Sequence, residues 1–590
     1  MPASQMREAA LAGGAQFDVV IRGGEVADGS GGPLIQADVA VRSGKIAAVG
    51  QVSGRGVEEI DARGQLVTPG FVDVHTHYDG QATWDQRMQP SSLHGVTTVV
   101  MGNCGVGFAP CRPSDHDLLI RLMEGVEDIP FPVLTQGLPW NWQDFPDYLD
   151  SLQSRTFDVD IGTQLPHAAL RVCVMGQRGA DREPATPEDI AAMTRIARDA
   201  IAAGALGFST SRTLNHRTSD GQPTPTLTAS EAELTGIALG LAEAGGGVLQ
   251  FVSDFADPEG EFGMLRRIVE RSGRPLSFSL TQHAHDPQRW QRLLGWLSDA
   301  ADGGLPMRAQ VCGRPVGVLL GLELTLHPFS AHPSYREISK RPFAERVAAL
   351  RDPAFQAKLL SETTRAQRGI VAQIARSWQQ LFPMGVQPDY EPAPEQSLAA
   401  LAAKSGKRPE ALALEHMLSD GGRGMLYLPF LNYAEGSLDP SYEMLRHPHT
   451  VPGLSDGGAH VGTICDGSFP TSNLTLWTRD RTRGPKLPLE YMVQQQTRAT
   501  AEALGLRDRG LIQPGYRADL NVIDYDRLQL LAPEVCYDLP AGGRRLMQRA
   551  RGYTATLVAG QITYRDGQPS GALPGRLIRG ERHITTGSAS

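Results

Sequence analysis

The segment Thr68-Pro-Gly-Phe-Val-Asp-Val-His-Thr-His-Tyr-Asp-Gly80 is the one around which the rest of the chain is organised. Its Pro-Gly pair marks a turn, and the apolar run that follows predicts a short buried strand. Side chains alternate along a strand, so His75 and His77 project from the same face where that strand ends. Two imidazoles at this spacing can share one metal ion. The alternative interpretation is a pair of hydrogen-bonded histidines.

The length, charge and cysteine content of the whole chain limit the kinds of protein it can be. With 590 residues it is long enough for more than one domain. A formal charge of −9 argues against nucleic acid or an anionic membrane as a partner. We find no apolar run long enough to span a bilayer and no secretion signal. The six cysteines are scattered, which favours reduced thiols and a cytoplasmic location. We expect a small-molecule substrate, and a homo-oligomer is left open.

Apolar strand-like segments alternate with amphipathic ones through the middle of the chain. This alternation predicts a parallel sheet covered by helices, for example at 187–203, 229–244 and 262–272. Eight strands are predicted, at residues 71–77, 97–103, 159–165, 206–210, 248–253, 276–282, 307–311 and 451–455. They favour an α/β fold, a closed (β/α)8 TIM-like barrel whose chemistry lies at the C-terminal strand ends.

Both ends of the chain carry short β segments separated by glycine turns. Their similar character predicts one small β-sandwich domain built from the two chain ends. A long connection before the last barrel strand predicts an inserted subdomain. The predicted divisions are an N-terminal arm at 1–16, the β-sandwich domain at 17–69 plus 510–568, the barrel at 70–509 with a helical insertion or lid at 320–445, and a loosely held tail at 569–590.

Two further strand ends carry reactive side chains to the same edge of the barrel. The second strand ends in Cys104, whose thiolate could bind or bridge metal ions, although a small buried thiol is the alternative. The eighth strand ends in Asp456, followed by two glycines and His460. Asp456 could contact a metal, accept a proton from the attacking water and pass it to a leaving amine. The alternative role of Asp456 is a helix cap. His460 is a candidate substrate-binding residue.

Together these segments resemble the amidohydrolase superfamily and, within it, the N-acyl-D-amino-acid deacylases (D-aminoacylases). The resemblance spans residues 17–565 and rests on the His-x-His strand, Asn103-Cys104-Gly105, Ser455-Asp456-Gly457-Gly458-Ala459-His460 and the split β domain. It implies a metal-dependent hydrolase, usually with zinc, that deacylates N-acyl-D-amino acids. It also implies that His75 and His77 bind the weaker metal position, that Cys104 replaces a lysine-derived bridge, and that Asp456 is the general base.

The lysine distribution supports a thiolate bridge. No lysine occurs between Lys45 and Lys340, so no barrel strand up to the seventh can supply a carboxylated lysine. Sites that resemble those of hydantoinases or dihydroorotases need that lysine, and they are disfavoured.

The fifth and sixth strands depart from the D-aminoacylase pattern, in which each gives a histidine to the tightly held metal. The fifth ends in Gln250-Phe-Val-Ser-Asp254, without a histidine. The sixth is followed by His283, out of register, which is the first substitute ligand unless it is a loop histidine facing solvent. Asp254 is a weaker substitute and better explained as a helix cap. One metal ion is therefore favoured over two, held by His75, His77 and Asp456, with or without Cys104.

An N-acyl amino acid also requires a cation for its free carboxylate, and arginine matches this geometry because it binds bidentately. Candidates at strand ends or on the loop after the fourth strand are Arg171, Arg212, Arg314 and His216. For each, a structural ion pair is the alternative. Residues 124–130 are a candidate loop over the site.

Two rival functions stay open at this point. The same metal centre could hydrolyse a different amide or a carbamate, because this fold hosts many substrates. A metal-free scaffold barrel is the other rival. The joint presence of two strand-end histidines, a cysteine and an aspartate argues against the scaffold, which has no need for that set.

Overall fold

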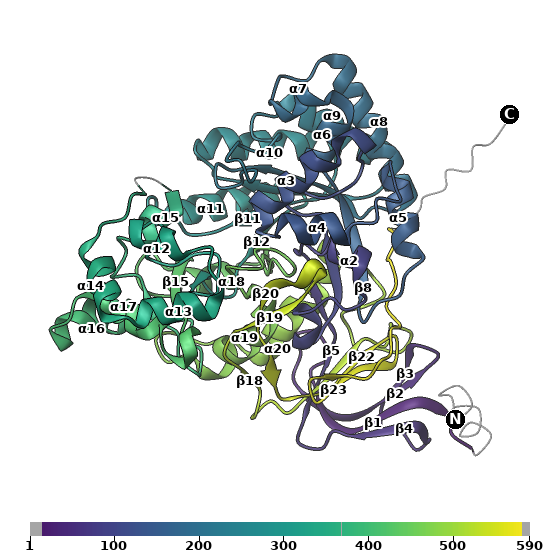
Figure 1. Cartoon of the computed structure of the whole chain (residues 1–590). Coiled ribbons are helices and arrows are strands. Elements are labelled where there is room, and N and C mark those ends of the chain that lie inside the picture. Colours follow the sequence, from purple (N-terminus) through teal and green to yellow (C-terminus); the bar gives the residue numbers. More distant parts are fainter. Residues whose placement is uncertain (1–13, 367–368, 581–590) are drawn as a thin grey trace.

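The structure is a computed structural model that describes residues 14–366 and 369–580 (Figure 1). Most of the predicted arm at 1–16 therefore lies outside the described residues, as does the end of the predicted tail. Within the described part of the chain, no helix has both the length and the apolar character needed to cross a bilayer.

The predicted barrel sheet is confirmed. Eight strands pair in parallel, in the spatial order β16-β12-β11-β10-β9-β8-β7-β6. Beyond the ends of the first and last strands, a parallel bridge joins Thr76 to Gly457, and the Asp456 amide donates to the His75 carbonyl at 3.1 Å. The strands are β6 (Phe71–Asp73), β7 (Val96–Met101), β8 (Asp160–Pro166), β9 (Gly207–Arg212), β10 (Val248–Ser253), β11 (Leu276–Leu280), β12 (Met307–Val311) and β16 (Thr450–Pro452).

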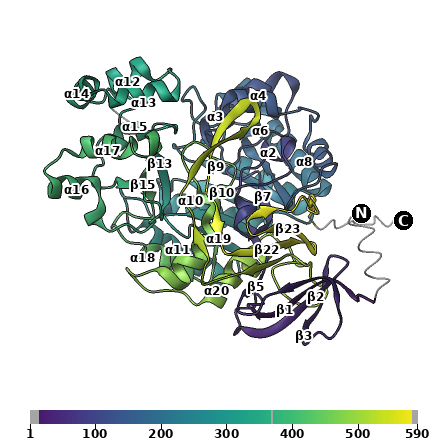
Figure 2. The same ribbon diagram turned by 60° about the horizontal axis from the view of Figure 1, so that its bottom comes forward.

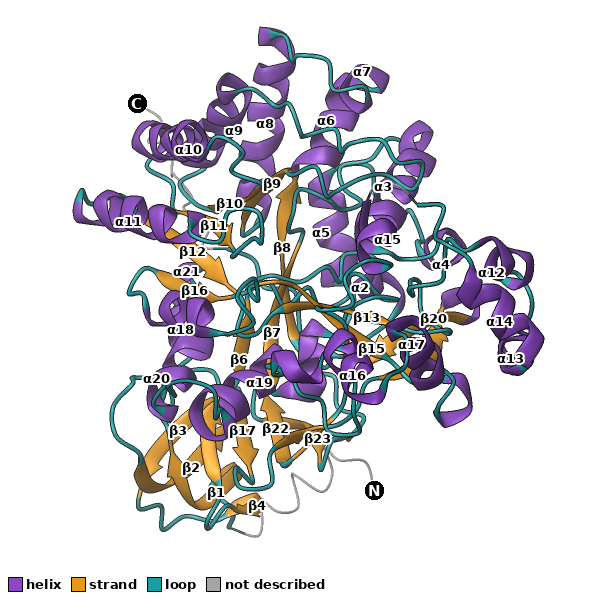
Figure 3. Cartoon of the chain, turned by 90° about the vertical axis from the view of Figure 1, so that its left-hand side faces the viewer, coloured by secondary structure: helices purple, strands orange, loops and turns teal. Residues whose placement is uncertain are grey.

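Helices cover the outer side of this sheet (Figures 1 and 3). Their starts follow capping chemistry: Thr186 and Asp189 form a capping box, and Ser230 and Asp257 each accept a first-turn amide. Apolar side chains of these helices join those of the strands in one large core. The main outer helices are α3 (His116–Glu127), α5 (Phe145–Gln153), α6 (His167–Met175), α8 (Pro187–Ala203), α9 (Glu231–Glu243), α10 (Pro258–Ser272), α11 (Arg289–Asp302) and α18 (Asp439–Arg446).

The two chain ends build one β domain, as expected. Its strands form a single nine-stranded sheet in the order β24-β23-β22-β17-β5-β1-β2-β3, with β4 also paired to β1. The two segments meet where β5 pairs with β17, and Val67 opposes Val522 there. The strands are β1 (Phe17–Val26), β2 (Ile35–Arg42), β3 (Lys45–Gly50), β4 (Gly56–Asp61), β5 (Leu66–Pro69), β17 (Leu520–Ile523), β22 (Tyr553–Val558), β23 (Gln561–Arg565) and β24 (Gln568–Pro569).

The inserted subdomain contains strands as well as helices. A small sheet of β13 (Val316–Leu320), β15 (Leu426–Leu431) and β14 (Phe382–Pro383) pairs in that order. Its helices enclose a separate apolar core, and Figures 1 and 2 show the insertion and the nine-stranded sheet on different sides of the barrel. These helices include α12 (Pro333–Ile338), α13 (Phe343–Arg351), α14 (Pro353–Ser361), α16 (Leu398–Ser405) and α17 (Pro409–Met417).

Two C-terminal segments make contacts that the sequence did not indicate. A hairpin of β19 (Glu534–Leu539) and β20 (Gly543–Met547) reaches the loop after the eighth strand, where the Leu546 amide donates to the Val461 carbonyl at 2.6 Å. The described part of the predicted tail is not loosely held. Leu577 is buried and forms a parallel β-bridge with Ile161 of β8.

A buried arginine joins the β domain to the barrel. The guanidinium of Arg509 lies 2.8 Å from Asp160, the first residue of β8, and 3.7 Å from Asp519, which precedes β17. All three side chains are almost fully buried. Arg517 also contacts both carboxylates, so removing Arg509 would leave one cation to compensate two buried charges.

We therefore expect Arg509→Ala to lower the free energy of unfolding by about 3–5 kcal/mol, as loss of one partner from a buried ion pair typically does. Urea denaturation followed by circular dichroism measures this change. Arg498→Ala is the control, because Arg498 forms an exposed pair with Glu502 on one helix and its loss should cost under about 0.5 kcal/mol. Equal stability of the two variants would contradict this role for Arg509.

Candidate metal centre

Three side chains from the first two barrel strand ends converge in a buried cluster. One ligand atom each from His75, His77 and Cys104 lies within 4.8 Å of the others. The Nε2 atom of His75 is 3.2 Å from the Cys104 sulfur. Within residues 14–366 and 369–580, this is the one group of three or more such side chains that converges so closely.

Asp456 adds a fourth donor from the eighth strand end. Its Oδ1 atom lies 3.4 Å from Nε2 of His75 and 3.5 Å from Nε2 of His77. This oxygen is buried and has no hydrogen-bond partner. Neighbouring ligands of a tetrahedral zinc ion stand about 3.3–3.6 Å apart, because metal–ligand bonds are about 2.0–2.3 Å long. The spacing of Asp456 from the two imidazoles therefore matches that of neighbouring zinc ligands, although Asp456 lies outside the group of three side chains whose ligand atoms all converge within 4.8 Å.

The backbone at these strand ends turns the side chains inward. Cys104 and Asp456 adopt left-handed conformations, with φ of 55° and 49°. Such conformations cost about 1–3 kcal/mol for residues other than glycine and persist only when surrounding contacts hold them. Gln250, on the fifth strand, supplies one such contact, because its Oε1 accepts the Cys104 amide at 3.1 Å. The fifth strand thus positions the thiol rather than supplying a histidine.

Both histidines have an acceptor next to Nδ1. In His75 this atom lies 2.6 Å from Oε1 of Gln310, on the seventh strand. In His77 it lies 3.2 Å from Oε1 of Glu127, although the alignment falls short of a hydrogen bond. Metal-binding histidines usually present their second ring nitrogen to a carboxylate or an amide oxygen in this way. A proton on Nδ1 leaves the Nε2 lone pair directed at the cluster.

Glu127 is a functional residue that the sequence analysis missed. It is the last residue of α3, almost fully buried, and its two carboxylate oxygens make no hydrogen bond. Its other oxygen faces Nε2 of His460 at 3.7 Å. The segment 124–130 was expected to form a loop over the site; instead a helix end places this one carboxylate behind the cluster. The density of acidic residues at 124–128 was the available signal.

Burial and mutual charge set the protonation of the cluster. Burial lowers the pKa of His75 to about 4, so that imidazole is neutral and able to bind a metal. Burial also lowers the pKa of His77, but its neighbours, Glu127 foremost, outweigh burial and raise that pKa well above the ordinary value. For Asp456, burial is outweighed by His77 and His75, and the pKa falls below its usual range.

The Cys104 thiol needs a cation to ionise. Burial raises its pKa to about 12, and the imidazolium of His77 offsets only part of that shift. A bound metal ion deprotonates a coordinating thiol outright. The buried thiol and the unpartnered Asp456 oxygen are therefore both consistent with a cation between them.

Of the residues predicted to bind substrate, His460 lies at this centre, with its Nε2 atom 3.7 Å from Glu127. Burial, and after it the charges of His460 and His77, lower the pKa of His216, on the loop after the fourth strand, to about 3. Its Nδ1 atom is 2.9 Å from the Ser211 hydroxyl. The His460 side chain is 30% exposed, which places it where the centre meets solvent.

Two of the three predicted arginines are committed to buried ion pairs. Arg171 is buried on α6 and lies 2.8 Å from Glu233. Arg314 is fully buried, 3.0 Å from Asp466. The sequence alone could not identify these partners because they are remote in the chain. Arg212 donates to the Ala229 carbonyl, but its buried Nε has no hydrogen-bond partner, so its contact with substrate stays a prediction.

The predicted substitute ligand His283 does not join the cluster. Its Nε2 atom contacts the Thr281 hydroxyl at 3.0 Å. The preceding residue, Gln282, exchanges hydrogen bonds with Asn432 of the insertion, which fixes the chain there against the insertion. Asp254 is not a helix cap either: it accepts from Thr213 and Leu214, and Asp257 caps the helix.

Comparison with known sequences places the chain among amidohydrolases. The profile described as the amidohydrolase family matches residues 58–564. The D-aminoacylase of Alcaligenes xylosoxydans xylosoxydans is 37% identical over 195 residues, which is 33% of this chain and 37% of that relative. The N-acyl-D-glutamate deacylase of the same organism is 27% identical and aligned over 96% of this chain and 98% of its own length.

Solved structures share the fold. A structure of D-aminoacylase superimposes with a TM-score of 0.63 at 24% identity, over 95% of this chain and 100% of that chain. The N-acyl-D-glutamate deacylase of Bordetella bronchiseptica, complexed with zinc and a phosphonate inhibitor, superimposes with a TM-score of 0.62 at 22% identity. The superposition covers 95% of this chain and 99% of that chain.

The position of Glu127 generates a test. We expect Glu127→Gln to weaken metal binding about 10–100-fold, because the neutral amide no longer supports the His77 imidazole. Titration calorimetry with zinc measures the affinity, and circular dichroism reports the fold. Glu124→Gln, on the same helix, is the control and should bind zinc as the parent does. Unchanged affinity in Glu127→Gln would exclude this role.

Proposed function

Because the chain belongs to the amidohydrolase family, whose members hydrolyse C–N bonds other than peptide bonds, we propose that it deacylates N-acyl-D-amino acids. The observation that carries the proposal is the convergence of His75, His77 and Cys104 within 4.8 Å, with Asp456 at 3.4 and 3.5 Å from the two imidazoles. The names of the two aligned relatives support an acylated D-amino acid as substrate.

The proposed cofactor is one zinc ion. Two imidazoles, a thiolate and a carboxylate form a mixed nitrogen, sulfur and oxygen set that zinc accepts in tetrahedral geometry. The fifth strand offers Gln250 and the segment after the sixth strand offers His283, and neither side chain joins the cluster as a ligand. A metal ion in this site would polarise the scissile carbonyl and lower the pKa of a water molecule.

Asp456 is the proposed general base and acid. Its depressed pKa keeps it ionised near neutrality, so it can accept the proton of the attacking water. Its side chain is 16% exposed, which leaves one path between the carboxylate and the substrate. The same carboxyl group would then deliver that proton to the leaving amine nitrogen.

His216 and His460 are the proposed contacts to the substrate carboxylate. His216 lies on the loop after the fourth strand and His460 on the loop after the eighth, where its side chain is 30% exposed. With its pKa lowered to about 3, His216 is neutral and would act as a hydrogen-bond donor through one ring nitrogen. His460 would meet the same group from the opposite loop.

One observation favours a second substrate class. The arginines expected to bind a free carboxylate, among them Arg171 and Arg314, are committed to Glu233 and Asp466. A substrate without that carboxylate, such as another linear amide or a carbamate, would need no such cation. This alternative keeps the same hydrolytic centre and changes only the group that is recognised.

Replacing Asp456 with Asn tests the proposed base. We expect turnover to fall at least about 100-fold, because general base catalysis typically contributes about 10²–10⁴-fold, while the circular dichroism spectrum stays unchanged. Asp420→Asn, at an exposed position in the insertion, is the control and should keep the parent rate. Substantial activity in Asp456→Asn would rule out its assigned role.

Substrate class is tested by amine release from matched N-acetyl-D- and N-acetyl-L-amino acids, before and after chelation and with zinc restored. We expect release from the D forms, its loss on chelation and its return with zinc. Release from neither series, with zinc bound, would support the alternative amide or carbamate. Release that chelation leaves unchanged would contradict metal dependence.

A further inference from the structure

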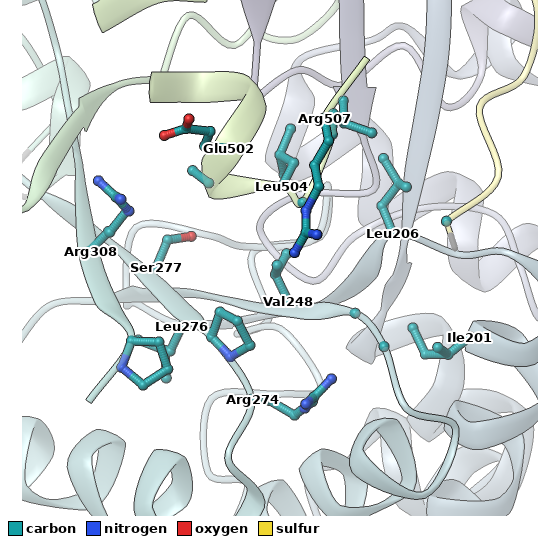
Figure 4. A pocket seen from close by; sticks show the side chains of 18 of the residues that line it. Ile201, Leu206, Val248, Arg274, Leu276, Ser277, Arg308, Glu502, Leu504 and Arg507 are labelled. Carbon is teal, nitrogen blue, oxygen red and sulfur yellow. The ribbon is translucent and has the colours of Figure 1, made fainter. Parts of the chain in front are cut away.

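A large cavity lies at the end of the barrel opposite the metal centre. Its volume is about 970 Å³, within the range typical of small-molecule sites. It is lined by the residues that open three strands: Val248 of β10, Leu276 of β11 and Met307 of β12. The segment after the last helix, which includes Leu504, forms another wall (Figure 4).

Tight glycine turns that follow helices border the cavity. Gly273, Gly304 and Gly505 line it, and each adopts a positive φ between 65° and 81°. A side chain added at any of the three would meet no atom within 4 Å. Glycine turns therefore leave open space in front of an apolar floor.

Three arginines surround this floor without a counter-ion. Among the described residues, the guanidinium groups of Arg274, Arg308 and Arg507 form neither an ion pair nor a hydrogen bond, and the buried Nε of Arg274 has no partner at all. Figure 4 shows all three side chains around the cavity. The nearby Glu502 carboxylate is already paired with Arg498 at 2.7 Å.

We propose that this cavity binds a small organic anion that joins an oxyanion group to an apolar body. Guanidinium groups bind carboxylate and phosphate oxygens bidentately, while the leucine and valine floor buries apolar surface. Each chemical half of the ligand therefore has a matching half of the cavity. The site is separate from the metal centre and does not depend on which amide the enzyme hydrolyses.

The cavity also has a direct connection to the metal centre. Ser277 lines the cavity, and its hydroxyl accepts from Nε2 of Gln310 at 3.0 Å. The Oε1 atom of the same amide lies 2.6 Å from Nδ1 of His75. One side chain thus bridges the cavity wall and a candidate metal ligand.

Octanoate is the probe, because it combines a carboxylate with an apolar chain. In titration calorimetry of the full chain with zinc, we expect one octanoate per chain. Acetate lacks the apolar part and octanamide lacks the charge, so each should bind at least about tenfold more weakly. Absence of octanoate binding, or equal binding of octanoate and octanamide, would overturn the proposal.

Substitutions of the cavity arginines test whether octanoate binds in this cavity. Arg308→Gln and Arg274→Gln should each weaken octanoate binding about tenfold, whereas Arg266→Gln, which removes an exposed cation paired with Glu270, should not. Equal melting temperatures would show that the variants are folded. Octanoate binding that survives both cavity substitutions but is lost on chelation would locate the ligand at the metal centre and contradict the proposal. Self-association that depends on Arg308, without octanoate binding, would show a subunit contact and equally contradict it.

Discussion

The hydrogen bond from the Asp456 amide to the His75 carbonyl is the contact on which the site depends. It joins the end of the first barrel strand to the end of the last, at 3.1 Å, beside the bridge between Thr76 and Gly457. Ser455 reinforces the closure through hydrogen bonds to Asp73 and to the His75 carbonyl. Without this closure, the only carboxylate donor of the cluster would not reach the two imidazoles.

A layer of amide side chains supports the donors from inside the barrel. Gln164, Gln250 and Gln310 come from the third, fifth and seventh strands, and they hold Asn103, the Cys104 amide and His75 respectively. Burying polar groups is favourable only when they are hydrogen-bonded, so each contact fixes the orientation of its neighbour. The polar interior therefore preorganises the cluster before any metal ion binds.

The local sequence was enough to predict the strands and the three strand ends that carry the four donors, since strand periodicity and parallel order determine where side chains emerge. Glu127 was missed because it ends a helix rather than a strand. Arg171 and Arg314 were misassigned because Glu233 and Asp466 satisfy them from distant segments. His283 was misassigned because the segment after the sixth strand pairs with Asn432 of the insertion, and His283 does not join the cluster. Such errors reflect tertiary contacts that no local pattern encodes.

The proposed zinc site holds a single ion between two histidines, one cysteine and one aspartate. X-ray absorption at the zinc edge of the reconstituted protein, together with its metal content, measures this ligand set. We expect one zinc per chain with one sulfur neighbour at about 2.3 Å and nitrogen or oxygen neighbours at about 2.0–2.1 Å. Two zinc ions per chain, or a zinc ion without a sulfur neighbour, would contradict it.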